Sequence, residues 1–215
     1  MENISSYIDH TFLGRAGERD AVRVLCDEAL KAKFASVCVN PAEVSLAKRL
    51  LLGSGVKVCT VIGFPLGQNT TAVKVFEAQD AIANGAEELD FVINIRLLKH
   101  NRDECRKELE SLAAVCKGKA VSKLIIECCE LTDEEKIASC KMAKEAGFDF
   151  VKTSTGFAAG GATTADVRLM RDSVGEEMGV KASGGIRDRE SALSMIEAGA
   201  SRIGSSRSCQ IAGLL

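Results

Sequence analysis

Eight short apolar stretches recur along the chain, separated by roughly 20 to 35 residues, with amphipathic segments between them. They cover residues 7–9, 36–39, 56–62, 89–93, 123–127, 148–152, 180–182 and 202–204. Polar and apolar residues do not alternate cleanly within them, which is typical of strands buried on both faces in a parallel sheet covered by helices. The repeat therefore predicts a series of strand-and-helix units.

The segments between these stretches carry helix signals at both ends. Apolar residues follow helical spacing in residues 18–33, 101–116 and 131–146. Thr132 and Glu135 have the spacing of a capping box, which marks a helix start. Glycine follows three of the expected helix ends, where a left-handed cap conformation favours it: Gly85, Gly147 and Gly199.

Residues 1–215 are therefore predicted to form one α/β domain, a single-domain (β/α)8 TIM barrel. No Pro- or Ser-rich linker divides the chain, which has only two prolines. A doubly wound open sheet is the alternative. It would need a glycine-rich dinucleotide fingerprint after an early strand, and the sequence has none.

Composition narrows the function. The net charge is −2, Trp is absent and Tyr occurs once, so nothing indicates a nucleic-acid partner. The nine cysteines lack disulfide or metal-ligand spacing, which argues against a metal site. Cys38, Cys59, Cys128 and Cys129 stand in apolar runs, which indicates buried thiols in a reducing compartment. No apolar run reaches the roughly 18 residues of a membrane span, and residues 1–4 lack a signal-peptide pattern. We expect a cytoplasmic protein with no membrane partner.

Two lysines stand at the carboxyl ends of expected strands, where a (β/α) barrel gathers its active site. Lys152 ends one apolar stretch and Lys181 lies in the next, one strand-and-helix unit later, so adjacent strands should carry them. An ordinary lysine is protonated and inert near neutral pH. A second buried cation favours the neutral, nucleophilic form. The pair predicts Schiff-base chemistry, with Lys152 as nucleophile and Lys181 favouring its neutral form.

Asp90 should point into the barrel near both lysines and hold or relay a proton during imine formation and carbon–carbon cleavage. The simpler interpretation is that each lysine extends its charge from a strand end into solvent. That interpretation suits one such lysine better than two on adjacent strands beside an inward carboxylate.

Two turns of small residues predict a phosphate site. Gly184 and Gly185 follow the seventh expected strand, and Ser206 follows the eighth. Backbone N–H groups in such turns bind anions, and barrels often hold a phosphate at these two loops. Arg207 could add a bidentate donor.

Other candidates are weaker. His10 and His100 are too few and too far apart for a zinc- or iron-dependent aldolase site, and no Gly-x-Ser-x-Gly elbow indicates a hydrolase. Glu127 either orients polar groups at the barrel mouth or pairs with a lysine there. Cys38 faces the mouth or the barrel wall, and packing is the favoured role.

These segments together resemble the 2-deoxy-D-ribose-5-phosphate aldolase family over nearly the whole chain. The resembling segments are 8–11, 36–41, 61–67, 74–78, 88–94, 123–127, 150–157 and 180–185. The resemblance implies a metal-independent, cofactor-free (β/α) barrel that cleaves 2-deoxy-D-ribose 5-phosphate to D-glyceraldehyde 3-phosphate and acetaldehyde. It implies Lys152 as the Schiff-base lysine and Asp90 with Lys181 as the proton-relay pair. It also implies phosphate contacts from Gly156, Gly184, Gly185 and Ser206.

The chain departs from the family pattern in three places: Arg96 replaces a usual glycine, Ala158-Ala159 replaces Gly-Thr, and Arg207 replaces a serine. The last change puts an arginine at the expected phosphate loop. None of them touches the three expected catalytic residues.

Three alternatives stay open. The chain could be another class I aldolase with a different sugar phosphate, a non-catalytic sugar-phosphate-binding barrel, or a flavin-binding barrel. A small-molecule sugar phosphate is the expected partner. Barrels of this kind often associate into homo-oligomers, although no interface motif is readable in this sequence.

Overall fold

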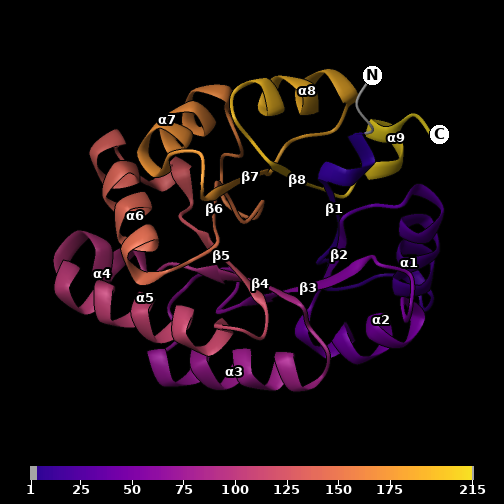
Figure 1. Cartoon of the computed structure of the whole chain (residues 1–215), viewed down its shortest axis with the longest axis horizontal. Helices are drawn as coiled ribbons and strands as arrows, with labels where there is room; N and C mark the ends of the chain where they lie inside the picture. Colours follow the sequence, from indigo (N-terminus) through magenta and orange to yellow (C-terminus); the bar gives the residue numbers. More distant parts are fainter. Residues whose placement is uncertain (1–3, 215) are drawn as a thin grey trace.

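Eight parallel strands close into a barrel, and the helices form a ring around it (Figure 1). The computed structural model describes residues 4–214. Each strand pairs with its neighbours in the sequence, and β8 pairs with β1 to close the barrel. Residues 1–3, which carry most of the signal-peptide argument, and residue 215 lie outside the described residues. The predicted (β/α)8 barrel is confirmed.

The strands are short and mostly buried. They are β1 Ile8–Phe12, β2 Ser36–Val39, β3 Lys57–Ile62, β4 Glu88–Val92, β5 Val121–Ile125, β6 Phe150–Lys152, β7 Gly179–Ser183 and β8 Arg202–Ser205. Every predicted strand overlaps an observed one. The prediction for β5 was two residues late, because Glu127 leaves the strand and adopts left-handed backbone at φ 58°.

The helical elements connect successive strands, except η1, which precedes β1, and α9, which follows β8. They are η1 Ile4–Tyr7, α1 Ala21–Ala32, η2 Pro41–Glu43, α2 Val44–Leu50, α3 Thr71–Ala83, α4 Ile95–His100, α5 Arg102–Cys116, η3 Cys128–Glu130, α6 Asp133–Ala146, α7 Thr164–Val174, α8 Arg189–Glu197 and α9 Ser208–Ala212. The capping box of Thr132 and Glu135 is confirmed at the start of α6. Within residues 4–214, no helix has the length and apolar character to cross a bilayer.

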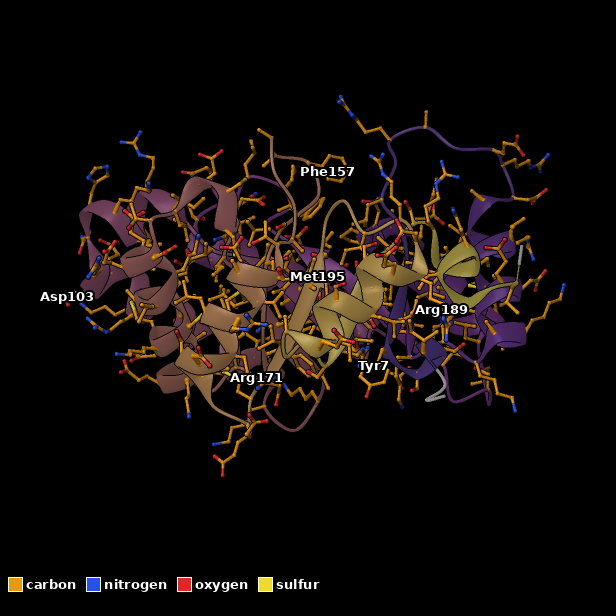
Figure 2. The ribbon with its side chains drawn as sticks, turned by 90° about the horizontal axis from the view of Figure 1, so that it is seen from above. Tyr7, Asp103, Phe157, Arg171, Arg189 and Met195 are labelled. Atoms are coloured by element: carbon orange, nitrogen blue, oxygen red, sulfur yellow. The ribbon has the colours of Figure 1, made fainter. Side chains whose placement is uncertain are left out.

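Strand alternation divides the interior into two regions. Successive side chains of a strand point to opposite faces, so in β4 Leu89 and Phe91 pack outward against the helices. Glu88 and Asp90 point into the barrel, where both are buried. The helix-facing layer is apolar and the barrel interior is charged. Figure 2 shows Phe157, which follows β6, at the upper rim of the barrel.

A buried ion pair outside the barrel interior joins α3 to α5. Lys74 Nζ lies 2.8 Å from Glu108 Oε1, and both side chains are buried. Lys74 also donates to the Val92 carbonyl oxygen at 3.0 Å, and the Thr71 hydroxyl donates to Glu108 Oε2 at 3.0 Å. These bonds fix two helices against the end of β4.

Substituting Glu108 by leucine should lower the free energy of unfolding by about 3–5 kcal/mol, because Lys74 would be left buried and unpaired. The double variant Lys74→Met/Glu108→Leu should recover most of that loss. Urea denaturation of the single and double variants measures both effects. A loss below about 1 kcal/mol in the single variant would show that the pair is not needed.

Candidate active site

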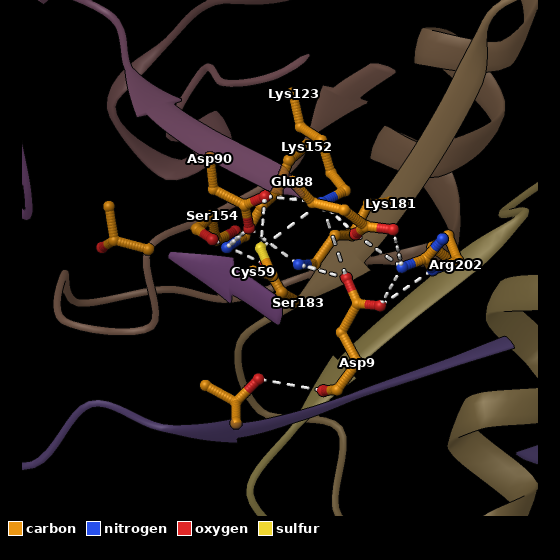
Figure 3. A network of polar contacts seen from close by, with 12 residues as sticks. Asp9, Cys59, Glu88, Asp90, Lys123, Lys152, Ser154, Lys181, Ser183 and Arg202 are labelled. Atoms are coloured by element: carbon orange, nitrogen blue, oxygen red, sulfur yellow. Dashed lines mark hydrogen bonds and ion pairs between the residues drawn. The ribbon is translucent and has the colours of Figure 1, made fainter. Parts of the chain in front are cut away.

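Strands β4, β6 and β7 bring three charged side chains together inside the barrel, Asp90 and Lys181 from the middle of their strands and Lys152 from the end of β6 (Figure 3). Lys152 and Lys181 each place Nζ 2.7 Å from the same oxygen, Oδ2 of Asp90. The two lysines are direct partners in the register of β6 and β7, which is why residues one unit apart meet. All three side chains are buried. The structure thus brings together the three residues predicted to carry the chemistry.

A third lysine, which sequence reasoning missed, occupies the other oxygen of Asp90. Lys123 Nζ lies 2.9 Å from Asp90 Oδ1 and 2.6 Å from Glu88 Oε2. The register of β4 and β5 places Lys123 directly opposite Asp90. The Cys59 thiol also donates to Asp90 Oδ1, at 3.2 Å. Asp90 is therefore the common partner of three lysines.

Asp9 and Arg202 extend this network toward the amino ends of the strands. Asp9 Oδ2 lies 2.5 Å from Lys181 Nζ. Asp9 Oδ1 accepts from Arg202 Nε at 2.8 Å and from the Ser36 hydroxyl at 2.7 Å. Arg202 Nη2 also lies 2.7 Å from Glu88 Oε2. One continuous set of ion pairs therefore fills the barrel interior.

Burial and charge oppose each other in this network. Burial alone would raise the pKa of Asp90, but the surrounding ammonium groups hold it well below its usual value. Burial alone would lower the pKa of Lys181, but the carboxylates of Asp9 and Asp90 raise it above its usual value. Near neutral pH, Asp90 is therefore ionised and Lys181 protonated, which places a fixed cation and a shared carboxylate beside Lys152.

A cleft of about 400 Å³ opens at the carboxyl ends of the strands, and Lys152 is part of its lining. The loops after β6, β7 and β8 contribute most of the wall. The four residues that the resemblance assigned to phosphate all line this cleft: Gly156, Gly184, Gly185 and Ser206. The structure therefore places the expected nucleophile and the expected phosphate loops around one space.

The arginine that lines the cleft is a different one from that expected. Arg207 is exposed, its backbone N–H donates to Ser205 Oγ at 2.9 Å, and it is not among the described residues that form the wall. Arg187, in the loop after β7, does line the cleft. A phosphate contact from Arg207 stays a prediction, and the place of Arg187 in the cleft wall makes it a second candidate for such a contact.

The loops after β6 and β7 meet backbone to backbone beside the cleft. The Ala162 N–H is shared between the carbonyl oxygens of Ser183, at 3.1 Å, and Gly184, at 3.0 Å. A Cβ added to Gly161 would lie 2.3 Å from the Gly184 oxygen, so no other residue fits there without moving a loop. Gly184 itself has φ 87°, which favours glycine.

Glu127 and Cys38 each had two interpretations. Glu127 accepts hydrogen bonds from the backbone N–H of Thr155 at 3.2 Å and from its hydroxyl at 2.5 Å. This supports the orienting role, because Thr155 belongs to the loop that follows Lys152. Cys38 is fully buried and packs with Leu13, Cys59 and Val61, which supports the packing role.

The histidines lie away from the lysines. His100 is exposed at the end of α4, and His10 Nε2 is 2.7 Å from Glu28 Oε2. Within residues 4–214, three groups of potential metal ligands have atoms within 4.8 Å of one another: His10–Glu28–Cys209, Cys38–Cys59–Asp90 and Asp9–Cys59–Glu88. In the last two, lysines or an arginine already neutralise the carboxylates. The absence of a metal from the chemistry stays a prediction.

Sequence reasoning assigned no role to four members of the network, Asp9, Glu88, Lys123 and Arg202. One signal could have found Glu88: it stands two residues before Asp90 and so shares its face of β4. A lysine in the apolar stretch of β5 was a second signal. Arg202 offered none, because a charged residue at the start of a strand is ordinary.

The fold is a closed parallel barrel, and its charged residues lie beside a glycine-lined cleft. These two features define the class of protein, an enzyme of the (β/α)8 barrel type. Residues 4–215 match the model of the DeoC/LacD family aldolases. The chain belongs to this family, and it is an aldolase, a lyase.

Individual relatives carry names that agree with this family assignment. The chain is 55% identical over 210 residues to the deoxyribose-phosphate aldolase of Alkaliphilus oremlandii, covering 97% of this chain and 95% of that protein. A crystal structure of a putative deoxyribose-phosphate aldolase from Coccidioides immitis superposes with a TM-score of 0.95 at 42% identity, covering 99% of this chain and 85% of that one. The deoxyribose phosphate aldolase of Aeropyrum pernix, described as a unique tetramer, gives 0.92 at 34% identity, covering 98% and 89%.

Proposed function

We propose that this aldolase reversibly cleaves 2-deoxy-D-ribose 5-phosphate to D-glyceraldehyde 3-phosphate and acetaldehyde through a Schiff base on Lys152. The observation that carries the proposal is the sharing of Asp90 Oδ2 by Lys152 and Lys181 at the base of a cleft. Such an arrangement holds a nucleophilic amine, a permanent neighbouring cation and a carboxylate within one hydrogen-bonded unit. The names of the relatives indicate the substrate.

The reaction begins with neutral Lys152, whose Nζ adds to C1 of the open-chain sugar. The carbinolamine loses water as Lys181 and Asp90 pass a proton to the leaving hydroxyl. The iminium nitrogen then withdraws electrons while the C2–C3 bond breaks, the C3 hydroxyl loses its proton, and glyceraldehyde 3-phosphate departs. The remaining enamine is protonated at C2, and water hydrolyses the imine to release acetaldehyde. The iminium nitrogen is the electron sink, so the proposed route needs no cofactor.

The phosphate is proposed to lie against Gly156, Gly184, Gly185 and Ser206. Binding energy from this remote group holds the sugar in the orientation that places C1 at Lys152. Backbone N–H groups suit an anion at this point because the glycines leave the wall without side chains.

Arg187→Met should raise KM for the phosphorylated sugar about tenfold, since a charge-assisted phosphate contact is worth about 1.5–3 kcal/mol. Arg207→Met, the matched control, should change KM less than about twofold, because Arg207 does not line the cleft. Steady-state kinetics with phosphorylated and unphosphorylated 2-deoxyribose measures both. Equal effects of the two substitutions would disprove this assignment of the guanidinium contact.

Borohydride trapping tests the proposed function directly. Protein incubated with 2-deoxyribose 5-phosphate and sodium borohydride should gain a covalent adduct, and peptide mass spectrometry should locate it on Lys152. Chromatography of the products should show glyceraldehyde 3-phosphate and acetaldehyde. Absence of an adduct from folded protein would reject the Schiff base, and cleavage of a different sugar phosphate alone would reject the substrate.

A homo-oligomer is also proposed, because the Aeropyrum pernix relative is described as tetrameric. Cytoplasmic location stays the expectation from composition.

A further inference from the structure

Arg202 lies at the amino end of β8, yet it is connected to Lys152 by an unbroken series of contacts (Figure 3). Arg202 Nη2 is 2.5 Å from Asp9 Oδ1, and Asp9 Oδ2 is 2.5 Å from Lys181 Nζ. Lys181 then shares Asp90 Oδ2 with Lys152, at 2.7 Å from each. A charge at one end of the barrel is therefore coupled to the nucleophile at the other.

This network has one more basic group than acidic groups. Within the described part of the chain, its members in direct contact are four basic side chains, Lys123, Lys152, Lys181 and Arg202, and three carboxylates, Asp9, Glu88 and Asp90. With every basic group protonated, the buried network carries an excess positive charge. An uncompensated buried charge is costly.

The basic groups of this network differ in the number of carboxylates that each one contacts. Among residues 4–214, Lys181 contacts Asp9 and Asp90, and Arg202 contacts Asp9 and Glu88. Lys123 contacts Glu88 and Asp90, and its Nζ lies 4.0 Å from Asp9 Oδ2. Lys152 has a single carboxylate partner in the same set, Asp90. Lys152 also lines the cleft. Loss of the excess proton from Lys152 therefore leaves every other ion pair intact.

We propose that Arg202 is a positioning residue whose permanent charge keeps Lys152 neutral. Its guanidinium occupies Asp9 and Glu88, so these carboxylates cannot offset a proton on Lys152. An arginine suits the role because its charge does not titrate. The inference rests on the proposed Schiff-base function and extends it to a residue that never meets the substrate.

Other titratable groups near Lys152 belong to β2, β3 and the loop after β5. Burial raises the pKa of Cys59, which stays a neutral thiol. The adjacent Cys59 side chain lowers the pKa of Cys38, so a Cys38→Ala background removes the titration of that thiol. Glu127 is bound to Thr155. Arg187 lines the cleft, and His10 is turned toward Glu28 on α1.

The test is the pH dependence of kcat/KM in the Cys38→Ala background. Arg202→Met should move the acidic limb of the profile to higher pH by about one unit, the effect expected of one buried charge at this range. Glu88→Gln should move it to lower pH. The double variant Arg202→Met/Glu88→Gln should return close to the parent profile, and Arg202→Lys should retain it.

If Arg202 were purely structural, Arg202→Met would lower kcat/KM without moving the acidic limb of the pH profile. The pH profile of the double variant would then be no closer to that of the parent. Either result overturns the inference. If Arg202→Met does not fold, the pH profiles of Glu88→Gln and Arg202→Lys test the inference instead. An acidic limb that does not move in Glu88→Gln overturns it. Borohydride trapping of the parent separates the two proposals. No adduct on Lys152 rejects the Schiff base itself, whereas a normal adduct with coincident profiles rejects only the role of Arg202.

Discussion

Substitution of Lys152 by leucine is expected to lower kcat by about 10⁴-fold or more while the barrel stays folded. Leucine removes the only atom that forms the imine in the proposed route, so no other residue can replace its function. Folding should survive because the substitution leaves the ion pairs of Lys181 and Lys123 intact. Steady-state aldol cleavage and circular dichroism measure the two effects.

Lys152→Arg is the matched control for charge. It places a permanent cation beside Asp90 and cannot act as a neutral amine, so it should be as inactive as leucine and equally free of borohydride adduct. Appreciable turnover in either variant would show that another group forms the Schiff base.

Substitution of Asp90 by asparagine is the second large effect. It removes the carboxylate shared by Lys123, Lys152 and Lys181, so kcat should fall about 10³-fold as the proton relay is lost. Unfolding free energy should fall by about 3–5 kcal/mol, because buried lysines lose their partner. Activity assays and urea denaturation measure the two losses.

The pH dependence of stability should change in a defined direction. The folded pKa of Asp90 lies well below its usual value, so its contribution to stability is present above the unfolded pKa of about 3.9. That contribution is lost as the pH falls through the lower folded value. Asp90→Asn should therefore be less stable than the parent at neutral pH and approach it in strong acid. Exposed Asp103→Asn should match the parent at every pH, and a matching curve for Asp90→Asn would contradict the ionised carboxylate.

The barrel was predictable because its strands are short apolar runs between helices with clear caps. The three residues expected to carry the chemistry were conspicuous for a related reason: a charged residue within or at the end of a buried strand is costly. The exact residues at which the strands end were less predictable. Glu127 seemed to continue β5, but its left-handed backbone ends the strand and directs its carboxylate to Thr155.

The charged interior could not be predicted in full, because it depends on register between strands. That Lys123 stands opposite Asp90 is a property of how β4 and β5 pair, which neither segment specifies alone. The choice between Arg187 and Arg207 depends on the course of two turns. Arg207 directly follows Ser206, and Arg187 stands two residues after Gly185. Only the folded loops show which of the two arginines lines the cleft.

The backbone contact between Gly161 and Gly184 joins the loops after β6 and β7 into one rigid unit. Any β-carbon at position 161 would separate them, and the shared N–H of Ala162 holds them together. Laboratory evolution toward bulkier acceptor aldehydes therefore has few tolerated substitutions where these two loops meet. Room for such substrates has to come from trimming a side chain elsewhere on the rim, such as that of half-exposed Phe157.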